Sequence, residues 1–452
     1  MTSDQKAEMS RRHAVALGAA AAVAAHSGQS EAKGRTEAKA LATASAKDLG
    51  LKPEGLKLLD ARMSALVSAG KRAGMVYAVA RGGKLAVLKA QGWRNLENKV
   101  PMTTDTIFRI YSMSRAVTGS AVLSLIDDGD LSLDDPVAKF IPDVAHMRVI
   151  REVLNGVVTA TAPQESPMTI RHLFNYTSGL GYAPAWPTGV GIQQRDILAL
   201  NQTTAEGIAK LTKYPLLWQP GAKWRYGFHS DVLGRVAEVV SGKTLADLVR
   251  ERVTAKLGMT DTGFWVDAQN QQRFADVYRM GPDGRGDTLV NGTALAPPSS
   301  SYLNPGTFFS GGGGLTSTAM NYLRFAEMLR QGGTLDGVKV LKPDTVKAMT
   351  TNTLTPAQGG EVYWNDEYAI DIFKGYGWGL ALGIRLPDAQ APTPHTVPGT
   401  TGDFGWYSLA NSVFFVDPTE EISAVALCHY QGPGEREIGA ALRAGVYAML
   451  GR

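Results

Sequence analysis

The chain has 452 residues, enough for a large hydrophobic core and for more than one structural lobe. Hydrophobic residues make up 44% and charged residues 19%, a balance typical of a globular protein rather than a disordered one. The formal net charge is only +4 and no dense run of Lys and Arg occurs, so no nucleic-acid partner is expected.

The cysteine and histidine content bears on two further features, disulfide bonds and metal sites. The single cysteine, Cys428, excludes an intrachain disulfide, and its apolar surroundings predict a core residue rather than a nucleophile. The seven histidines are scattered without metal-type spacing, so we expect no metal site and no other cofactor.

Residues 1–25 have the pattern of an export signal. Arg11 and Arg12 precede an Ala-rich apolar run that is too short to span a bilayer as a helix of the mature protein. Together with a cleavage candidate at Ala22-Val-Ala24, this pattern indicates twin-arginine (Tat) export to the periplasm, with no membrane anchor after processing. A disordered Ala-rich tail is the alternative. Residues 26–49, rich in Ser, Ala, Lys and Glu, are expected to form a linker.

Residues 50–452 are expected to form one domain. Its first elements are a helix over Pro53–Ala69 and an antiparallel hairpin, in which residues 74–80 and 85–90 flank a turn at 81–84. A helix follows Ser112 and ends near Gly129. Because this helix carries apolar residues on most sides, we expect it to be buried.

The middle of the chain, about 131–370, mixes helices with long loops that contain Pro and Gly. Helices are expected at Ser230–Ser241, Leu245–Leu257 and Ala319–Gln331. The run Gly311–Gly314 lacks the Gly-Lys-Ser/Thr ending of a phosphate loop. We therefore expect these glycines to allow close backbone packing beneath the cleft.

Strands return near the C-terminus, at Gly377–Ile384, Trp406–Val416 and Glu421–His429, and a helix over Glu435–Leu450 closes the chain. The sequence thus predicts an α/β fold. An antiparallel sheet flanked by helices would come from about 50–130 and 371–452, and a mainly helical lobe from about 131–370. The site is expected in the cleft between the sheet and the helical lobe.

An ordered set of motifs carries a resemblance to a known family. The set comprises Ser112-Met-Ser-Arg115, Leu131-Ser-Leu-Asp-Asp-Pro-Val137, Thr169–Tyr182 with its Thr-Ser-Gly-Leu-Gly-Tyr ending, Pro220-Gly-Ala-Lys-Trp-Arg-Tyr226 followed by Asp231-Val-Leu-Gly, and Gly402-Asp-Phe-Gly-Trp406. No single motif is decisive. In this order they resemble the serine β-lactamase-like superfamily, specifically the family VIII carboxylesterases related to class C β-lactamases. The resemblance runs from about Leu51 to the C-terminus and implies a serine β-lactamase/D,D-peptidase-like fold.

The resemblance implies an acyl-transfer site with a serine nucleophile. Ser112 would be the nucleophile, Tyr226 would hold the proton during acylation, and the backbone N–H groups of Ser112 and Leu409 would bind the oxyanion. The family has a lysine where this chain has Arg115, and arginine in practice cannot give up its proton. Arg115 is therefore expected to act as a fixed cation beside Tyr226, or as a structural ion-pair partner in a protein that has lost catalysis.

Two further motifs and one single position depart from the family pattern. Gly227-Phe228 stands where class C enzymes have Ala-Asn, and Tyr176 stands where the family has histidine. Trp406-Tyr407-Ser408 stands where the related esterases have Trp-Gly-Gly and the lactamases have Lys-Thr-Gly. We expect Tyr182, Trp406, Tyr407 and Ser408 to bind substrate, with Tyr407 as a wall of the cleft. Without a cation at position 406, β-lactams are expected to be poor substrates.

The sequence therefore predicts a serine hydrolase of the carboxylesterase kind (EC 3.1.1). It would cleave an ester or an amide bond of a small molecule through an acyl-enzyme on Ser112. Two alternatives stay open: a catalytically weakened binding protein that keeps the cleft, and a hydrolase of small peptides or amides.

Overall fold

The computed structural model describes residues 40–280, 289–291, 302–358, 375–387, 397–432 and 435–452. The predicted export signal and residues 26–39 of the predicted linker lie outside these ranges. Residues 40–49 are not a linker, because Leu41 is buried in the core and the N–H of Ala44 donates to the carbonyl of Leu85 at 3.1 Å. The folded domain thus includes residues ahead of the predicted boundary at residue 50.

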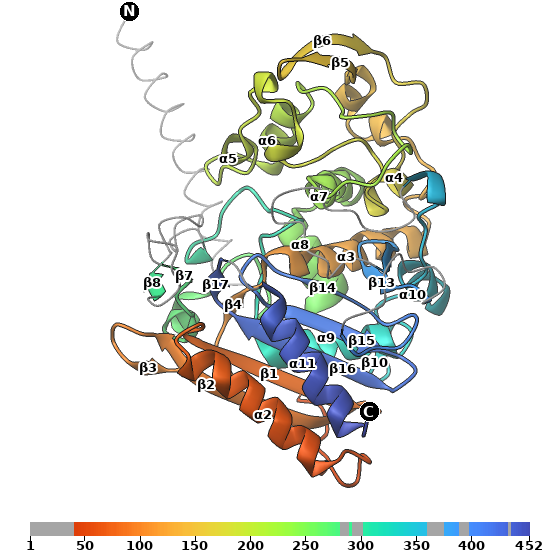
Figure 1. The fold of residues 1–452 in the computed structure, drawn as a ribbon. Coiled ribbons are helices and arrows are strands. Elements are labelled where there is room, and N and C mark those ends of the chain that lie inside the picture. The colour runs from red at the N-terminus through yellow and green to blue at the C-terminus, as the bar shows by residue number, and fades with distance from the viewer. Residues whose placement is uncertain (1–39, 281–288, 292–301, 359–374, 388–396, 433–434) are drawn as a thin grey trace, which may run out of the picture. The chain divides into compact units, whose positions relative to one another are not determined.

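One eight-stranded antiparallel sheet joins the two ends of the domain, in the order β12-β13-β14-β15-β16-β1-β2-β3 (Figure 1). The N-terminal part supplies β1 (Gly74–Arg81), β2 (Lys84–Asn95) and β3 (Val100–Pro101). The C-terminal part supplies β12 (Tyr376–Trp378), β13 (Gly383–Arg385), β14 (Phe404–Tyr407), β15 (Val413–Asp417) and β16 (Ile422–Cys428). The two parts meet where β1 pairs with β16, from Met75 opposite Cys428 to Arg81 opposite Ile422. The predicted antiparallel sheet built from both ends of the chain is confirmed.

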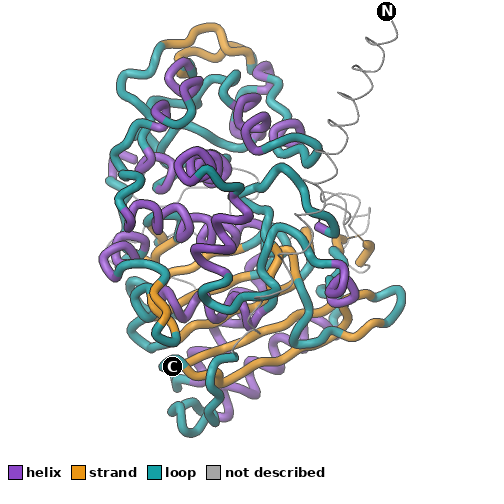
Figure 2. Tube along the Cα trace, turned by 180° about the vertical axis from the view of Figure 1, so that it is seen from behind, coloured by secondary structure: helices purple, strands orange, loops and turns teal. Residues whose placement is uncertain are grey.

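Helices cover both faces of this sheet (Figures 1 and 2). On one face lie α2 (Pro53–Ser68) and α11 (Glu435–Met449), and on the other lies α9 (Ala319–Arg330), which contacts β1, β15 and β16. Side chains of β1 alternate between the two cores, Tyr77 and Val79 facing α2 and α11 while Val76 and Ala78 face the other side. Every residue of β1 except the last is therefore buried.

Residues from the middle of the chain form a helical lobe around α7 (His229–Ser241), against which α3 (Ser114–Asp128) packs. The predicted boundaries at 131 and 370 do not separate the two parts, because α3 precedes residue 131 and α9, within 131–370, covers the sheet. Elsewhere in the described part of the chain, the α-helices are α4 (Ile170–Phe174), α5 (Gln194–Ile197), α6 (Thr204–Leu211), α8 (Leu245–Val249) and α10 (Pro343–Met349). Short strands outside the main sheet are β4 (Phe108–Arg109), β7 (Tyr278–Met280), β8 (Leu289–Asn291), β9 (Thr316–Ser317), β10 (Thr334–Leu335), β11 (Val338–Lys339) and β17 (Tyr430–Gln431). A hairpin of β5 (Val149–Leu154) and β6 (Val157–Ala162) was not predicted, although its Asn155-Gly156 turn is a strong hairpin signal.

Three predicted elements are interrupted in the structure. The strand predicted at 377–384 is split into β12 and β13, where the N–H of Gly379 donates to the carbonyl of Leu382 at 2.9 Å. The strand predicted at 406–416 is split by a five-residue loop between β14 and β15, in which Asn411 adopts a φ of 64°. The helix predicted at 245–257 is α-helical only to Val249 and continues as a π-helical turn, Arg250–Thr254.

A buried histidine anchors the strand that leads to Ser112. The Nε2 atom of His429 accepts the N–H of Arg109 in β4 at 2.7 Å, and its Nδ1 lies 3.0 Å from the carbonyl of Ala275. This pairing requires a neutral ring that donates from Nδ1. Burial, with a further contribution from the charge of Arg109, lowers the pKa of His429 to about 3.

We expect His429→Gln to weaken the pH dependence of stability. An unfolded histidine binds a proton below about pH 6.5, whereas folded His429 resists protonation until about pH 3. The stabilisation is therefore fully present above pH 6.5 and falls as the pH drops toward 3, by about 2 kcal/mol between pH 7 and pH 5. Urea unfolding at these two pH values measures the difference. The exposed His146→Gln variant is the control, and an unchanged pH dependence in His429→Gln would contradict the assignment.

Candidate active site

Ser112 lies in a short 3-10 turn, Tyr111–Met113, directly ahead of α3, and this turn packs against β14. The two flanking residues are buried, whereas Ser112 is partly exposed. Neighbouring contacts hold the turn in place, since the hydroxyl of Tyr322 donates to the carbonyl of Met113 at 2.8 Å. Within the described part of the chain, the Ser112 hydroxyl forms no hydrogen bond. The serine is thus fixed through its backbone and open at its side chain.

Backbone strain marks the residue before the serine. Tyr111 has a φ of 39°, a left-handed conformation that costs a bulky residue about 1–3 kcal/mol. Its ring is buried, and its hydroxyl accepts a hydrogen bond from Nε2 of Gln431 at 3.1 Å. These contacts hold the strained residue in place.

Arg115 is fully buried and surrounded by acceptors. Its Nη1 donates to the hydroxyl of Tyr176 at 2.8 Å, to the carbonyl of Gly227 at 3.2 Å and to Oγ of Ser230 at 3.4 Å. Its Nη2 donates to the hydroxyl of Tyr182. The guanidinium is therefore bound to the helical lobe rather than to the serine one turn earlier.

One buried carboxylate lies near this cation without touching it. Burial raises the pKa of Asp231, while the charge of Arg115 opposes that rise. Burial also works against the charge of Arg115, but its tyrosine neighbours and Asp231 raise its pKa well above the ordinary value. Arg115 therefore stays charged and is unable to take a proton from Ser112.

The glycine run around Gly312 packs against both Asp231 and Arg115. Oδ1 of Asp231 accepts hydrogen bonds from Oγ of Ser310 at 2.6 Å and from the N–H of Gly312 at 3.1 Å. A Cβ at Gly312 would lie 2.7 Å from Oδ2 of Asp231 and 3.3 Å from Nη2 of Arg115. A Cβ at Gly311 would lie 2.2 Å from the backbone carbonyl oxygen of Ser230, so the predicted close backbone packing is confirmed at that glycine.

Tyr226 is buried between Arg115 and the sheet. The guanidinium carbon of Arg115 lies 4.1 Å from the centre of the Tyr226 ring, over the ring face. The indole Nε1 of Trp406 donates to the Tyr226 hydroxyl at 2.9 Å, and the two rings stack with centroids 5.5 Å apart. The structure thus brings together Arg115 and Tyr226, as the sequence predicted, and places Trp406 against Tyr226.

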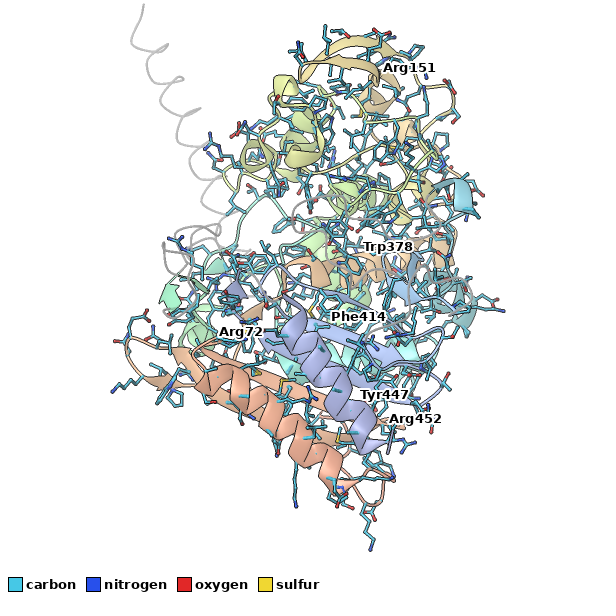
Figure 3. All side chains as sticks on the ribbon, viewed as in Figure 1. Arg72, Arg151, Trp378, Phe414, Tyr447 and Arg452 are labelled. Carbon is cyan, nitrogen blue, oxygen red and sulfur yellow. The ribbon has the colours of Figure 1, made fainter. Side chains whose placement is uncertain are left out.

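Aromatic side chains enclose the other side of the cation. The ring of Tyr176 stacks on His229 at 4.4 Å and packs on Trp378, labelled in Figure 3, at 4.6 Å. Burial raises the pKa of Tyr176 to about 12, against the opposing effect of Arg115. Burial, together with Arg115, lowers the pKa of His229 far below its usual range, so this histidine is neutral.

Tyr182 contacts both the buried cation and the aromatic rings beside it. Its hydroxyl accepts from Arg115, while its partly buried ring lies edge-on to Tyr226 at 5.9 Å and to Phe228 at 4.9 Å. The sequence indicated Tyr176 only as a departure from the family pattern. It indicated neither Ser230 as an acceptor for Arg115 nor Asp231 as the nearby carboxylate. The motif after Tyr226, which contains both, was the available signal.

The prediction that Tyr407 walls the cleft is wrong. Successive residues of a strand face opposite sides of the sheet, so Trp406 faces Tyr226 while Tyr407 points to the face covered by α11. A Cβ at Gly439 of α11 would lie only 2.8 Å from the Tyr407 ring. Tyr407 is therefore a packing residue behind the site.

The side chain of Ser408 is also not directed at a substrate. It is buried, and its Oγ accepts the N–H groups of Ala410 at 3.1 Å and Ser412 at 3.2 Å. Leu409, next in the chain, is 54% exposed at the loop that follows β14. The structure thus gives Ser408 a role in the loop rather than in contact with a ligand.

No group of three or more His, Cys, Asp or Glu side chains arranged to hold a metal occurs among the described residues. In the same part of the chain, every helix is too short or too polar to cross a bilayer.

Comparison with known proteins identifies the family. The family model described as Beta-lactamase matches residues 59–448. Protein Rv1367c of Mycobacterium tuberculosis is 33% identical over 373 residues, which cover 82% of this chain and 89% of that protein. Esterase EstB of Burkholderia gladioli is 31% identical over 412 residues, covering 86% of this chain and 94% of the esterase. The solved structure of EstCE1, a hydrolase with promiscuous acyltransferase activity, superposes with a TM-score of 0.71 at 26% identity, over 87% of this chain and 98% of that one.

The match spans most of the chain, and the fold and the serine-bearing turn agree with it. The protein therefore belongs to the beta-lactamase family, in the superfamily of serine β-lactamase-like esterases and acyltransferases.

Proposed function

We propose that this protein is a carboxylesterase-like serine hydrolase that cleaves an ester of a small molecule through an acyl-enzyme on Ser112. The observation that carries the proposal is the cluster of Arg115, Tyr226 and Trp406, one helical turn from a partly exposed serine. An amide substrate would use the same site with a poorer leaving group.

In the acylation step, Oγ of Ser112 attacks the ester carbonyl and its proton passes to Tyr226. The tetrahedral oxyanion is held by the N–H groups of Ser112 and Leu409. The intermediate then collapses, the bond to the alcohol breaks, and Tyr226 returns the proton to the leaving oxygen. In the second half, water attacks the acyl-enzyme and gives its proton to Tyr226. The bond between the acyl carbon and Oγ of Ser112 then breaks, Tyr226 returns the proton to that oxygen, and the acid leaves.

Arg115 and Trp406 assist this proton transfer without taking part in it. A guanidinium over the ring face and an indole N–H on the hydroxyl both interact favourably with negative charge on Tyr226. The cation is held by hydrogen bonds to Tyr176, Tyr182 and Ser230, so it does not need to move during the reaction. This supports Tyr226 as the sole general base.

A second candidate function is a binding protein that keeps the cleft without efficient catalysis. It is favoured by the absence, within the described residues, of a hydrogen bond between the Ser112 hydroxyl and either Arg115 or Tyr226. Such bonds are often formed only in the substrate complex, so the two functions need a chemical test.

Loss of the nucleophile tests the first proposal directly. Ser112→Ala is expected to abolish hydrolysis of p-nitrophenyl butyrate and covalent labelling by a fluorophosphonate, while leaving the unfolding midpoint in urea close to that of the wild type. The wild type should gain one phosphonyl group by intact mass. A wild type that neither labels nor hydrolyses any ester or amide would instead support the binding protein.

The preference for esters over β-lactams follows from the surroundings of Tyr226. The single N–H of the Trp406 side chain donates to the Tyr226 hydroxyl, and the ring brings no charge to a substrate carboxylate. Phe228 is buried and its side chain has no amide to offer. We expect kcat/KM for nitrocefin to be at least about 100-fold below that for p-nitrophenyl butyrate, the scale of one lost charged or hydrogen-bonded contact. Comparable values for the two substrates would refute this preference.

Arg115→Lys separates the catalytic from the structural effect of the cation. Lysine is able to act as a base, so acylation is expected to rise by about 10- to 1000-fold. A lysine donates from one nitrogen, whereas two nitrogens of the Arg115 guanidinium now donate to Tyr176, Gly227 and Tyr182. Because some of these hydrogen bonds would be lost, the free energy of unfolding should fall by about 1–3 kcal/mol. Arg115→Met, which removes the charge, is the control and should lose activity. An Arg115→Lys variant slower than the wild type would show that the site depends on arginine.

A further inference from the structure

The loop between β14 and β15 has an unusual distribution of hydrogen bonds. Ser408 closes the loop with its backbone, since its N–H donates to the carbonyl of Ser412 at 2.8 Å and its carbonyl accepts the N–H of Asn411 at 3.0 Å. Its side-chain oxygen accepts two more N–H groups, those of Ala410 and Ser412. One serine therefore binds three of the four N–H groups that follow it in the loop.

The remaining N–H belongs to Leu409. Within the described residues, this N–H forms no hydrogen bond, although every other N–H of the loop does. A backbone donor that lacks a partner in a well-bonded loop is suited to receive a ligand atom. The loop is bonded so that a single donor remains for an external oxygen.

Asn411 connects this loop to the interior. At a φ of 64°, its side chain accepts from Nη2 of the buried Arg72 at 2.7 Å and donates from Nδ2 to the carbonyl of Tyr430 at 3.0 Å. The N–H of Tyr430 in turn donates to the carbonyl of Ala410 at 3.2 Å. Figure 3 labels Arg72, and these bonds fix the loop to the start of β17.

The same short strand contacts the serine turn. Gln431, which follows Tyr430 in β17, donates from Nε2 to the hydroxyl of Tyr111 at 3.1 Å. Tyr111 is the strained residue directly before Ser112. Hydrogen bonds at both residues of β17, together with the backbone between them, thus connect the loop to the turn that carries the nucleophile.

We propose that Ser408 and Asn411 are positioning residues that hold the Leu409 N–H as an oxyanion donor at a fixed place relative to Ser112. This inference rests on the proposed acyl transfer at Ser112 and assigns to both side chains an effect on the transition state rather than on substrate binding. Without the Ser408 oxygen, the N–H groups of Ala410 and Ser412 lose their acceptor and the loop relaxes. The donor then lies away from the position that the oxyanion occupies.

The test compares kcat, KM and the affinity for butylboronic acid, whose serine adduct is a tetrahedral anion. Removing a whole oxyanion donor costs about 100- to 1000-fold in kcat, so the displaced donor of Ser408→Ala should lose about 10- to 100-fold. The inhibition constant of the boronic acid should rise by a similar factor, while KM for p-nitrophenyl butyrate changes by less than about 3-fold. Ser408→Thr, which keeps a γ-oxygen, should recover most of the lost kcat.

Two further variants complete the design. Ser423→Ala removes a buried serine hydroxyl of β16 that has no hydrogen-bond partner among the residues that the structure describes. This variant should leave kcat and boronic acid affinity unchanged. Asn411→Gly suits the backbone conformation and removes the contacts to Arg72 and Tyr430, so it should lower kcat in the same manner. It carries the test if Ser408→Ala does not fold.

The outcomes are distinct. A wild type that fails to label with a fluorophosphonate removes the proposed function and this inference with it. In an active wild type, the inference alone falls if Ser408→Ala and Asn411→Gly keep the wild-type kcat, if they lose kcat without weakening the boronic acid, or if Ser423→Ala loses as much. A matched loss in kcat and boronic acid affinity, with Ser408→Thr rescuing it, supports the inference.

Discussion

The buried guanidinium of Arg115 is the constraint on which the site depends. Removing such a charge from water costs several kcal/mol unless its donors are bonded, so the surrounding chain must bring acceptors to it. Tyr176 and Tyr182 come from one loop of the helical lobe, and Gly227 and Ser230 come from the segment that begins α7. Two segments distant in sequence are thus held around α3 by one side chain.

This arrangement also explains why several departures from the family pattern occur together. A planar fork reaches more acceptors than an ammonium group, and the Tyr176 hydroxyl takes one of its donors while also contacting Ser230 at 2.9 Å. Gly312 passes close over both Arg115 and Asp231, where a side chain would not fit. The arginine at position 115 therefore depends on the residues that surround it, and those residues depend on the arginine.

Much of the fold was predictable because apolar patterns are long and consistent there. The strands around residues 74–90 and 422–428, the helix after Ser112 and the closing helix are buried elements whose composition agrees with their structure. The loop at 408–412 was missed because Leu409 and Ala410 continue the apolar pattern, while the turn depends on a side-chain acceptor and on one positive φ.

For the site, the sequence identified Tyr226 as a neighbour of Arg115, and the contact confirms this. It did not predict that Trp406 would bind the Tyr226 hydroxyl. The placement of Tyr407 in the cleft was wrong for a reason visible in the sequence, since adjacent residues of a strand cannot face the same side. The partners of Arg115 were missed, because they are set by how the loops before α5 and α7 fold over α3 and not by spacing within one motif.

The pairing of β1 with β16 has a consequence for how the chain reaches this structure. These central neighbours lie near opposite ends of the domain, so the middle of the sheet cannot form until the last strands have been synthesised. Until then, one edge of β1 is unpaired, and its residues are almost wholly apolar. Such an edge is an aggregation hazard, and contacts between distant residues form slowly. A newly made chain therefore depends on protection of its N-terminal hairpin during the interval before its C-terminal strands arrive.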